Sequence, residues 1–171
     1  MQHHFVLVSF EFNMIISNKQ LYPFYAKCVE LGVPMGLHSS MSFSNRPMYM
    51  SYPMHIDQVA LDFPELNILF VNPGFPWVNE LVALAWRHPR VHICTSAVRA
   101  KYLGHPSADY QMLIHHANSM LADKFIYASS YPLLPFDRNL EEAKQLPLKV
   151  ESMKKFLGDN IARILKMESK P

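Results

Sequence analysis

Apolar runs alternate with amphipathic segments along the whole chain. Continuous apolar runs rich in β-branched and aromatic residues predict buried strands at 5–12, 33–38, 67–72, 91–95 and 125–129. Between them, apolar residues recur at helical spacing and predict helices over 21–31, 54–63, 77–88, 108–121, 139–156 and 159–166. Strands that alternate with helices are typical of parallel βαβ units. The pattern therefore predicts an α/β fold, a parallel sheet with helices on its outer face.

The helical spacing also predicts which positions face the core. These are Phe24, Cys28 and Leu31 in the first helix, Ile56, Val59, Ala60 and Phe63 in the second, Trp77, Leu81, Leu84 and Ala85 in the third, and Tyr110, Leu113, Ile114, Ala117 and Leu121 in the fourth. Gly32 is expected to end the first helix. Five strand–helix units are too few for an eight-unit barrel of ~200 residues or more, so an open sheet and part of a barrel both remain.

Length and composition limit the function classes. The chain of 171 residues is half hydrophobic and only 18% charged, which favours one folded domain over disorder. The net charge of +2 comes from scattered basic residues, so we expect no nucleic-acid partner. No run approaches the ~18 apolar residues of a membrane span, and no cationic region precedes the first apolar stretch. We therefore expect no membrane partner and a cytoplasmic location, which the two separated cysteines, Cys28 and Cys94, also fit.

Candidate chemistry follows the predicted strands. His38 ends the second strand, Asn72 the third, and Ser129 and Ser130 the last. Enzymes with parallel sheets place their chemistry at these carboxyl ends. Phosphate-binding glycine loops and nucleophile-elbow motifs are absent from the sequence. Pro89 separates His88 from His92 and argues against a paired-ligand site on a helix.

Several segments resemble one family. The stretches ELGVPMGLHSS, DFPELNILFVNPGFPWVNELVALAWRHPRVHICTS and DKFIYASSYP, followed by FLGDNIARIL, are similar to the later half of amidohydrolase-related proteins. These are metal-dependent hydrolases and decarboxylases built on a TIM barrel, and they include the aminocarboxymuconate-semialdehyde and resorcylate decarboxylase types. The resemblance implies a partial (half) TIM-type (β/α) barrel of about five parallel strands with outer helices. It also implies one amidohydrolase-related domain over 1–171, truncated on its N-terminal side.

The resemblance assigns roles to individual residues. His38 matches a metal-binding histidine of the family, Asn72 stands where the family has a second histidine, and Ser130 stands at the family's aspartate. The first-strand His-x-His motif is missing from the sequence. Since a catalytic metal needs about three protein ligands, His38 alone is an insufficient set. The family's divalent metal, such as zinc, is therefore not expected in this chain. The implied pocket consists of His38, Asn72, Trp77, Ser130 and Tyr131.

Each candidate also has a structural interpretation. His38 fits a hydrogen-bonding role in a polar pocket, Asn72-Pro73-Gly74 a strand-to-helix turn, and Trp77 and Trp86 helix packing. The methionine-rich loop after His38, with Met41, Met48, Met50 and Met54, either lines an apolar pocket or forms exposed or partner-covered surface.

Two functional hypotheses follow from the resemblance. One is a family member with lost or impaired catalysis. The alternative is an active hydrolase or carboxy-lyase for a small carboxylate, in a barrel completed by another chain. Because part of a barrel exposes an edge strand and its inner face, we also expect self-association or a partner subunit, through the first strand.

Overall fold

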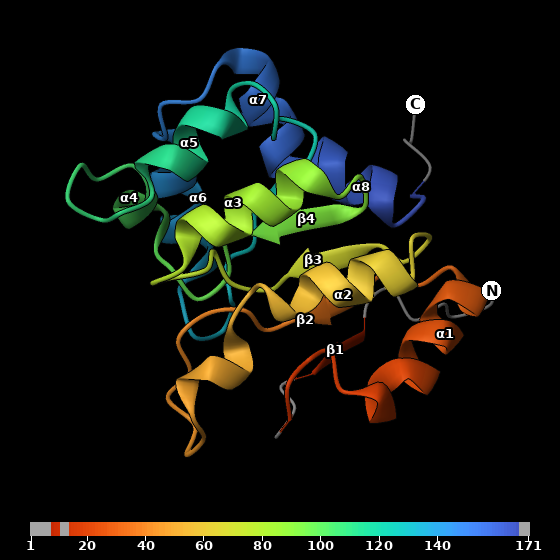
Figure 1. The fold of residues 1–171 in the computed structure, drawn as a ribbon. Helices are drawn as coiled ribbons and strands as arrows, with labels where there is room; N and C mark the ends of the chain where they lie inside the picture. Colours follow the sequence, from red (N-terminus) through yellow and green to blue (C-terminus); the bar gives the residue numbers. More distant parts are fainter. Residues whose placement is uncertain (1–7, 11–13, 168–171) are drawn as a thin grey trace.

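The computed structural model describes residues 8–10 and 14–167 and contains one five-stranded sheet (Figure 1). All neighbouring strands pair in parallel and follow chain order. The strands are β1 (Val8–Phe10), β2 (Met35–Leu37), β3 (Ile68–Phe70), β4 (Val91–Cys94) and β5 (Phe125–Ile126). The predicted α/β fold with a parallel sheet is confirmed, although β2, β3, β4 and β5 are each shorter than the predicted strand. Of the predicted first strand, 5–7 and 11–12 lie outside the described residues.

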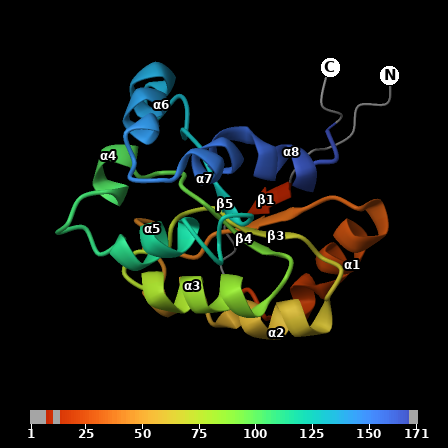
Figure 2. The same cartoon turned by 90° about the horizontal axis from the view of Figure 1, so that it is seen from above.

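At least one helix lies between each pair of successive strands, as βαβ units require. The helices are α1 (Tyr22–Leu31), α2 (His55–Asp62), α3 (Val78–Arg87), α4 (Ala100–Leu103), α5 (Gln111–Ala117), α6 (Phe136–Lys144), α7 (Val150–Lys154) and α8 (Asn160–Ile164), with a π-helical turn, η3 (Lys155–Asp159), between the last two. Short 3₁₀ turns, η1 (Lys19–Leu21) and η2 (Met48–Ser51), precede α1 and α2. Seen from above, α1, α2 and α3 line one side of the sheet, and α7 and α8 lie on the other (Figure 2).

Alternation along the strands divides the core into two parts. Ile68 and Phe70 of β3 join the large core beneath the helices, whereas Leu69 between them faces the opposite side. There Leu69 packs with Cys94, Ile126 and, from α8, Ile164. We call this second side the inner face of the sheet. Because both sides are covered by apolar groups, the strands are apolar almost throughout rather than alternating, with His92 in β4 as the polar exception.

Most of the predicted helix faces are buried as expected. Ile56, Val59 and Ala60 of α2, Leu81, Leu84 and Ala85 of α3, and the stripe from Tyr110 to Leu121 all join the large core. In α1 the prediction is right for Cys28, which is buried, and wrong for Phe24 and Leu31, which are exposed; Tyr25 faces inward instead. The Tyr25 hydroxyl donates to the Ile16 carbonyl at 2.8 Å, which gives the buried ring a polar partner that a hydrophobicity pattern does not register.

Helix boundaries in the last third of the chain differ from the prediction. The break falls at 145–149, between α6 and α7, and the helix then continues through Gly158 without interruption. Pro147 explains the break, because it lacks an amide donor and disfavours helical geometry at Leu146. The predicted helix 108–121 is reduced to Gln111–Ala117 plus turns, and the short helix α4 was not predicted. In the described part of the chain, no helix is long and apolar enough to cross a membrane.

Candidate functional site at the carboxyl edge of the sheet

Two of the predicted site residues meet at the carboxyl ends of β2 and β3. The strands are parallel and pair Leu37 with Phe70, so His38 and Asn72 leave the sheet side by side. With its amide nitrogen facing the Val71 carbonyl at 2.7 Å and the Ser96 hydroxyl at 3.1 Å, Asn72 accepts a hydrogen bond from His38 Nε2 at 2.9 Å. In the opposite orientation the amide oxygen would face the Val71 carbonyl oxygen and the amide nitrogen would face His38 Nε2, so these hydrogen bonds would be lost.

Ser130 joins the same edge from β5. Its hydroxyl accepts a hydrogen bond from the backbone N–H of Ala97, the residue after Ser96. Ala97 and Ser130 both have positive φ angles, 64° and 57°, which are unfavourable for residues with a Cβ. The tight connections after β4 and β5 therefore carry backbone strain and are tied together by this bond. The carboxyl edge thus holds a row of polar groups from four neighbouring strands: His38, Asn72, Ser96 and Ser130.

The other predicted pocket residues have different environments. Trp77 precedes α3, is partly buried, and packs edge-on against Tyr52 with ring centroids 5.5 Å apart. This contact ties the β2–α2 connection to α3, which supports the packing interpretation of Trp77. Trp86 is 61% exposed, yet its ring lies against that of His116 of α5 with centroids 6.1 Å apart, so it packs at the edge of the contact between α3 and α5. Tyr131 is 73% exposed and follows the strained Ser130 at the surface.

The donor set of this edge does not fit a catalytic divalent metal. It offers one imidazole, one neutral amide oxygen and two hydroxyls, and the imidazole Nε2 already donates to the amide. Zinc and manganese sites need about three strong ligands, usually including a carboxylate or further imidazoles. Across residues 8–10 and 14–167, no group of three or more histidine, cysteine, aspartate or glutamate side chains could hold a metal ion.

A buried histidine on the inner face of β4 was not predicted as part of any site. His92 is 2% exposed and pairs in register with Leu69. Burial, together with the positive charges of Lys124, Arg163 and Arg90, lowers the pKa of His92 to about 3. Burial also raises the pKa of Cys94, two residues further along the strand, to about 12. Both side chains are therefore neutral near pH 7, and they form a polar but uncharged strip on the inner face.

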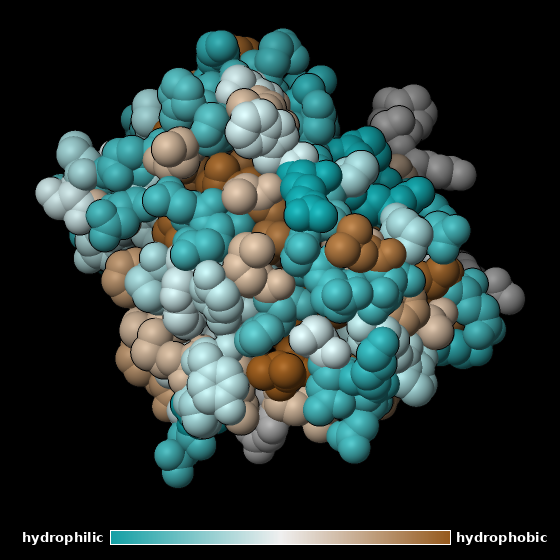
Figure 3. Space-filling view, viewed as in Figure 1, coloured by the Kyte–Doolittle hydropathy of each residue, from teal (hydrophilic) through white to brown (hydrophobic). Residues whose placement is uncertain are grey.

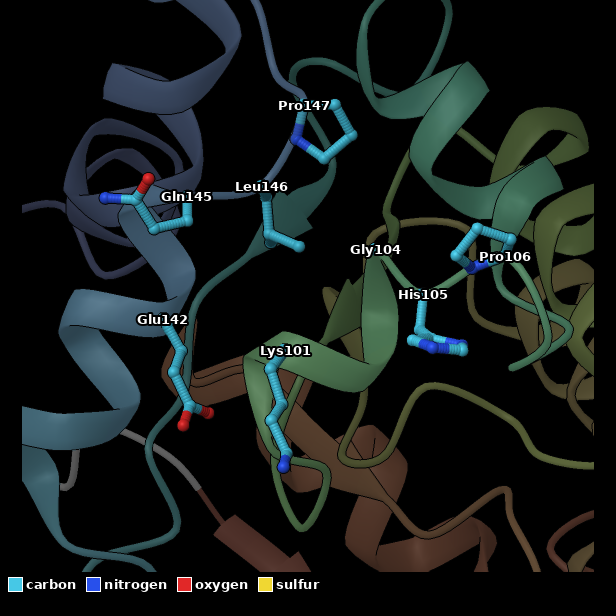
Figure 4. Close-up of a pocket in the computed structure, with 8 residues that line it drawn as sticks. All are labelled: Lys101, Gly104, His105, Pro106, Glu142, Gln145, Leu146 and Pro147. Carbon is cyan, nitrogen blue, oxygen red and sulfur yellow. The ribbon is translucent and has the colours of Figure 1, made fainter.

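A separate cleft of about 370 Å³ lies between α4 and α6, away from this edge's polar row (Figure 4). Its lining includes the polar side chains of Lys101, His105, Glu142 and Gln145 and the apolar ones of Leu146 and Pro147. Glu142 is engaged elsewhere, because Arg99 and Arg138 both donate to its carboxylate. None of the predicted site residues lines this cleft.

A family profile and several solved structures match the chain. The amidohydrolase profile matches residues 6–167. An uncharacterised TIM-barrel protein from Bordetella bronchiseptica is 30% identical and superimposes with a TM-score of 0.82, over 94% of this chain and 57% of that one. No functionally curated protein matches the sequence.

Several more distant matches are decarboxylases and agree with this chain in fold alone. For 2,6-dihydroxybenzoate decarboxylase from Rhizobium the identity is 17% and the TM-score 0.63, over 91% of this chain and 58% of the enzyme. A dihydroxybenzoic acid decarboxylase from Polaromonas, solved with bound manganese, is 15% identical with a TM-score of 0.62, over 91% of this chain and 56% of the enzyme. The chain therefore spans a little over half of these proteins, and its five strands form part of a TIM-type barrel.

Proposed function

The chain belongs to the amidohydrolase family, and from this premise we propose that the isolated chain lacks the family's metal-dependent catalysis. The observation that carries the proposal is the contact between His38 and Asn72. At a position where the family resemblance implies a second metal-binding histidine, a neutral amide accepts a hydrogen bond from the first. The two side chains satisfy one another and leave no pair of imidazoles facing an open position.

Ser130 supports the same conclusion from the other end of the edge. The resemblance implies a carboxylate at this position, which would take up or release a proton during the reaction. A serine hydroxyl is not a competent base near neutral pH. In addition, the Ser130 hydroxyl accepts a hydrogen bond from Ala97, so its role here is to hold the connection after β4.

A second candidate function rests on the open sheet. Five strands in chain order, covering 57% of the Bordetella protein, leave both edge strands, β1 and β5, without a further neighbour among the described residues. A second polypeptide that supplies the remaining strands would also supply ligands from them. In that case the complex, rather than this chain, would be the hydrolase or carboxy-lyase for a small carboxylate.

Carbon dioxide release from 2,6-dihydroxybenzoate, a substrate named for a structural neighbour, tests the proposal. The purified chain is assayed with added Mn²⁺ or Zn²⁺ and, as a control, with a chelator. We expect the same background rate in all three conditions, and the same rate for His38→Ala. Turnover that requires the metal and disappears in His38→Ala contradicts the proposal. Activity that appears only when the unmatched part of the Bordetella protein is added supports the second candidate instead.

A further inference from the structure

The cleft between α4 and α6 is a candidate binding site that the proposed function does not use. Its volume of about 370 Å³ lies within the range of small-molecule pockets. On the face shown in Figure 3, apolar residues lie scattered among polar ones. In the cleft, by contrast, Pro106, Leu146 and Pro147 line a single hollow whose lining is mainly apolar. Figure 4 shows Leu146 and Pro147 at one end and the side-chain ends of Lys101 and Glu142 at the other.

The charge in the cleft lining that no other group neutralises is positive. Lys101 and Glu142 are the charged side chains of the lining. The Glu142 carboxylate already accepts hydrogen bonds from Arg99, through two nitrogens, and from Arg138. The Arg99 hydrogen bond is the main reason why the pKa of Glu142 is lowered, so this carboxylate stays ionised and paired. The Lys101 ammonium instead lies 4.7 Å from the centre of the Tyr102 ring. The cleft therefore favours an anionic ligand.

His105 and Gln145 add neutral hydrogen-bond donors to the lining. His105 Nδ1 accepts a hydrogen bond from the Ser107 N–H at 3.2 Å. In the neutral ring the proton is therefore on Nε2, which can donate to a ligand. The side-chain amide of Gln145 offers a second donor. Donors of this kind complement the oxygens of a carboxylate, because an ionised carboxylate only accepts hydrogen bonds.

Two side-chain amides hold the walls of the cleft in place. Gln111 donates to the carbonyl of His105 at 2.8 Å and to the carbonyl of Pro106. Asn118 donates to the carbonyl of Pro147, on the other wall, at 2.8 Å. Gln111 begins α5 and Asn118 directly follows it, so one helix positions both walls. A preorganised site loses little conformational freedom on binding, which favours affinity.

Gly104 leaves space inside the cleft. A Cβ at this position would lie 3.2 Å from Leu146 Cδ2 and 3.4 Å from Pro147 Cδ. The φ of Gly104 is −89°, which residues with a side chain also adopt. The absence of a side chain here therefore matters for the space beside Leu146 and Pro147 rather than for the backbone conformation.

We propose that this cleft binds a small carboxylate with an aliphatic body. Lys101 pairs with the carboxylate, and His105 and Gln145 donate hydrogen bonds to it. Leu146 and Pro147 contact the aliphatic body and remove it from water. The site is separate from the polar row at the carboxyl edge of the sheet, and the proposal does not depend on the proposed loss of catalysis.

Titration of the full chain with isovalerate, followed by two-dimensional NMR in the presence of a chelator, tests the proposal. Isovaleramide has the same aliphatic body without the charge, and acetate has the charge without the body. We expect isovalerate to bind with a dissociation constant of roughly 1 mM, and each control ligand to bind about tenfold more weakly or less. The amide signals of Gly104 and His105 should shift on binding. Because an ion pair contributes, the affinity should fall at high salt.

Two variants test the assigned roles. Lys101→Met removes the charge but keeps an apolar stem, and it should weaken binding about tenfold. Lys19→Met is the matched control, because Lys19 also lies over a tyrosine ring, that of Tyr22 at 4.9 Å, but does not line the cleft. It should leave the affinity unchanged. Gly104→Ala places a methyl group beside Leu146 and should also weaken binding, while circular dichroism shows that the fold is retained.

Four results overturn the proposal. They are no binding of isovalerate up to roughly 20 mM, equal affinity for isovaleramide, an affinity unchanged in both Lys101→Met and Gly104→Ala, and loss of binding in His38→Ala. The last result would place the ligand at the carboxyl edge of the sheet instead. Since the titration measures binding without metal, none of these results decides whether the chain has metal-dependent activity.

Discussion

Replacing His92 with leucine should remove a specific part of the protein's acid sensitivity. His92 is 2% exposed on the inner face of the sheet, and its pKa falls from the ordinary 6.5 to about 3. Below pH 6.5 the unfolded chain binds a proton at this residue that the folded chain does not. The contribution of His92 to stability is therefore complete above this pH and is lost progressively as the pH falls toward the folded-state value.

The expected magnitude follows from these two pKa values. Between pH 7 and pH 5, linkage predicts a loss of about 2 kcal/mol from His92 alone. The loss at pH 5 is nearly the same for any folded-state pKa below about 4, so it does not depend on the depth of the shift. Against a total stability of about 5–15 kcal/mol, a difference of this size is readily measured.

Urea unfolding of the parent and of His92→Leu at both pH values measures the difference. The eight other histidines are common to both proteins and cancel in the comparison. We expect the parent to lose about 2 kcal/mol more than the variant on acidification. Cys94→Ala is the matched control on the same face of β4: its thiol, with a pKa of about 12, stays neutral throughout, so its effect should be equal at both pH values. Equal acid losses in the parent and His92→Leu would refute the assignment.

Two further predictions concern stability and are measured by the same urea unfolding. Gly74 has a φ of 85°, and a Cβ there would lie 2.9 Å from Leu81 Cδ1, so Gly74→Ala should lower the free energy of unfolding by about 1–3 kcal/mol. Gly158→Ala is the control: no atom lies within 4 Å of its new Cβ, so it should cause no loss of stability. Equal effects of the two substitutions would contradict this. Asn160 Nδ2 donates to the carbonyls of Ala122 at 2.8 Å and Phe125 at 2.9 Å, so Asn160→Ala should lower the free energy of unfolding by about 1–3 kcal/mol. Asn160→Asp should lower it further, because a carboxylate oxygen would then face both carbonyls. A smaller loss for aspartate than for alanine would show that these hydrogen bonds are not formed.

Periodicity predicted the βαβ order and most buried helix faces because both depend on local alternation of apolar and polar residues. It failed at α1, where Tyr25 is buried with its hydroxyl bonded to Ile16, a pairing that depends on residues outside the helix. It also missed the helix break at Pro147, where the local sequence did carry a signal.

The candidate site was predictable only in part. Strand ends identified His38, Asn72 and Ser130, since the carboxyl ends of parallel strands meet at one edge. Nothing in the sequence pointed to Ser96, because its role arises from contacts between separate strands. It is hydrogen-bonded to Asn72, and the next residue, Ala97, is hydrogen-bonded to Ser130. For His92 the sequence analysis only argued against a paired-ligand site with His88, although its place in the apolar run of β4 already put it inside the sheet.

We propose that this chain lacks a catalytic metal site because of Asn72 and Ser130 at the carboxyl edge of its sheet. Metal titration of the parent and of Asn72→His/Ser130→Asp, with Zn²⁺ followed by calorimetry, tests it most directly. The account predicts no stoichiometric binding by the parent. It predicts measurable binding by the variant, which presents two imidazoles and a carboxylate from the ends of β2, β3 and β5 at the same edge of the sheet, a sufficient number of ligands for zinc. Binding of one equivalent by the parent, lost in His38→Ala, would contradict the account.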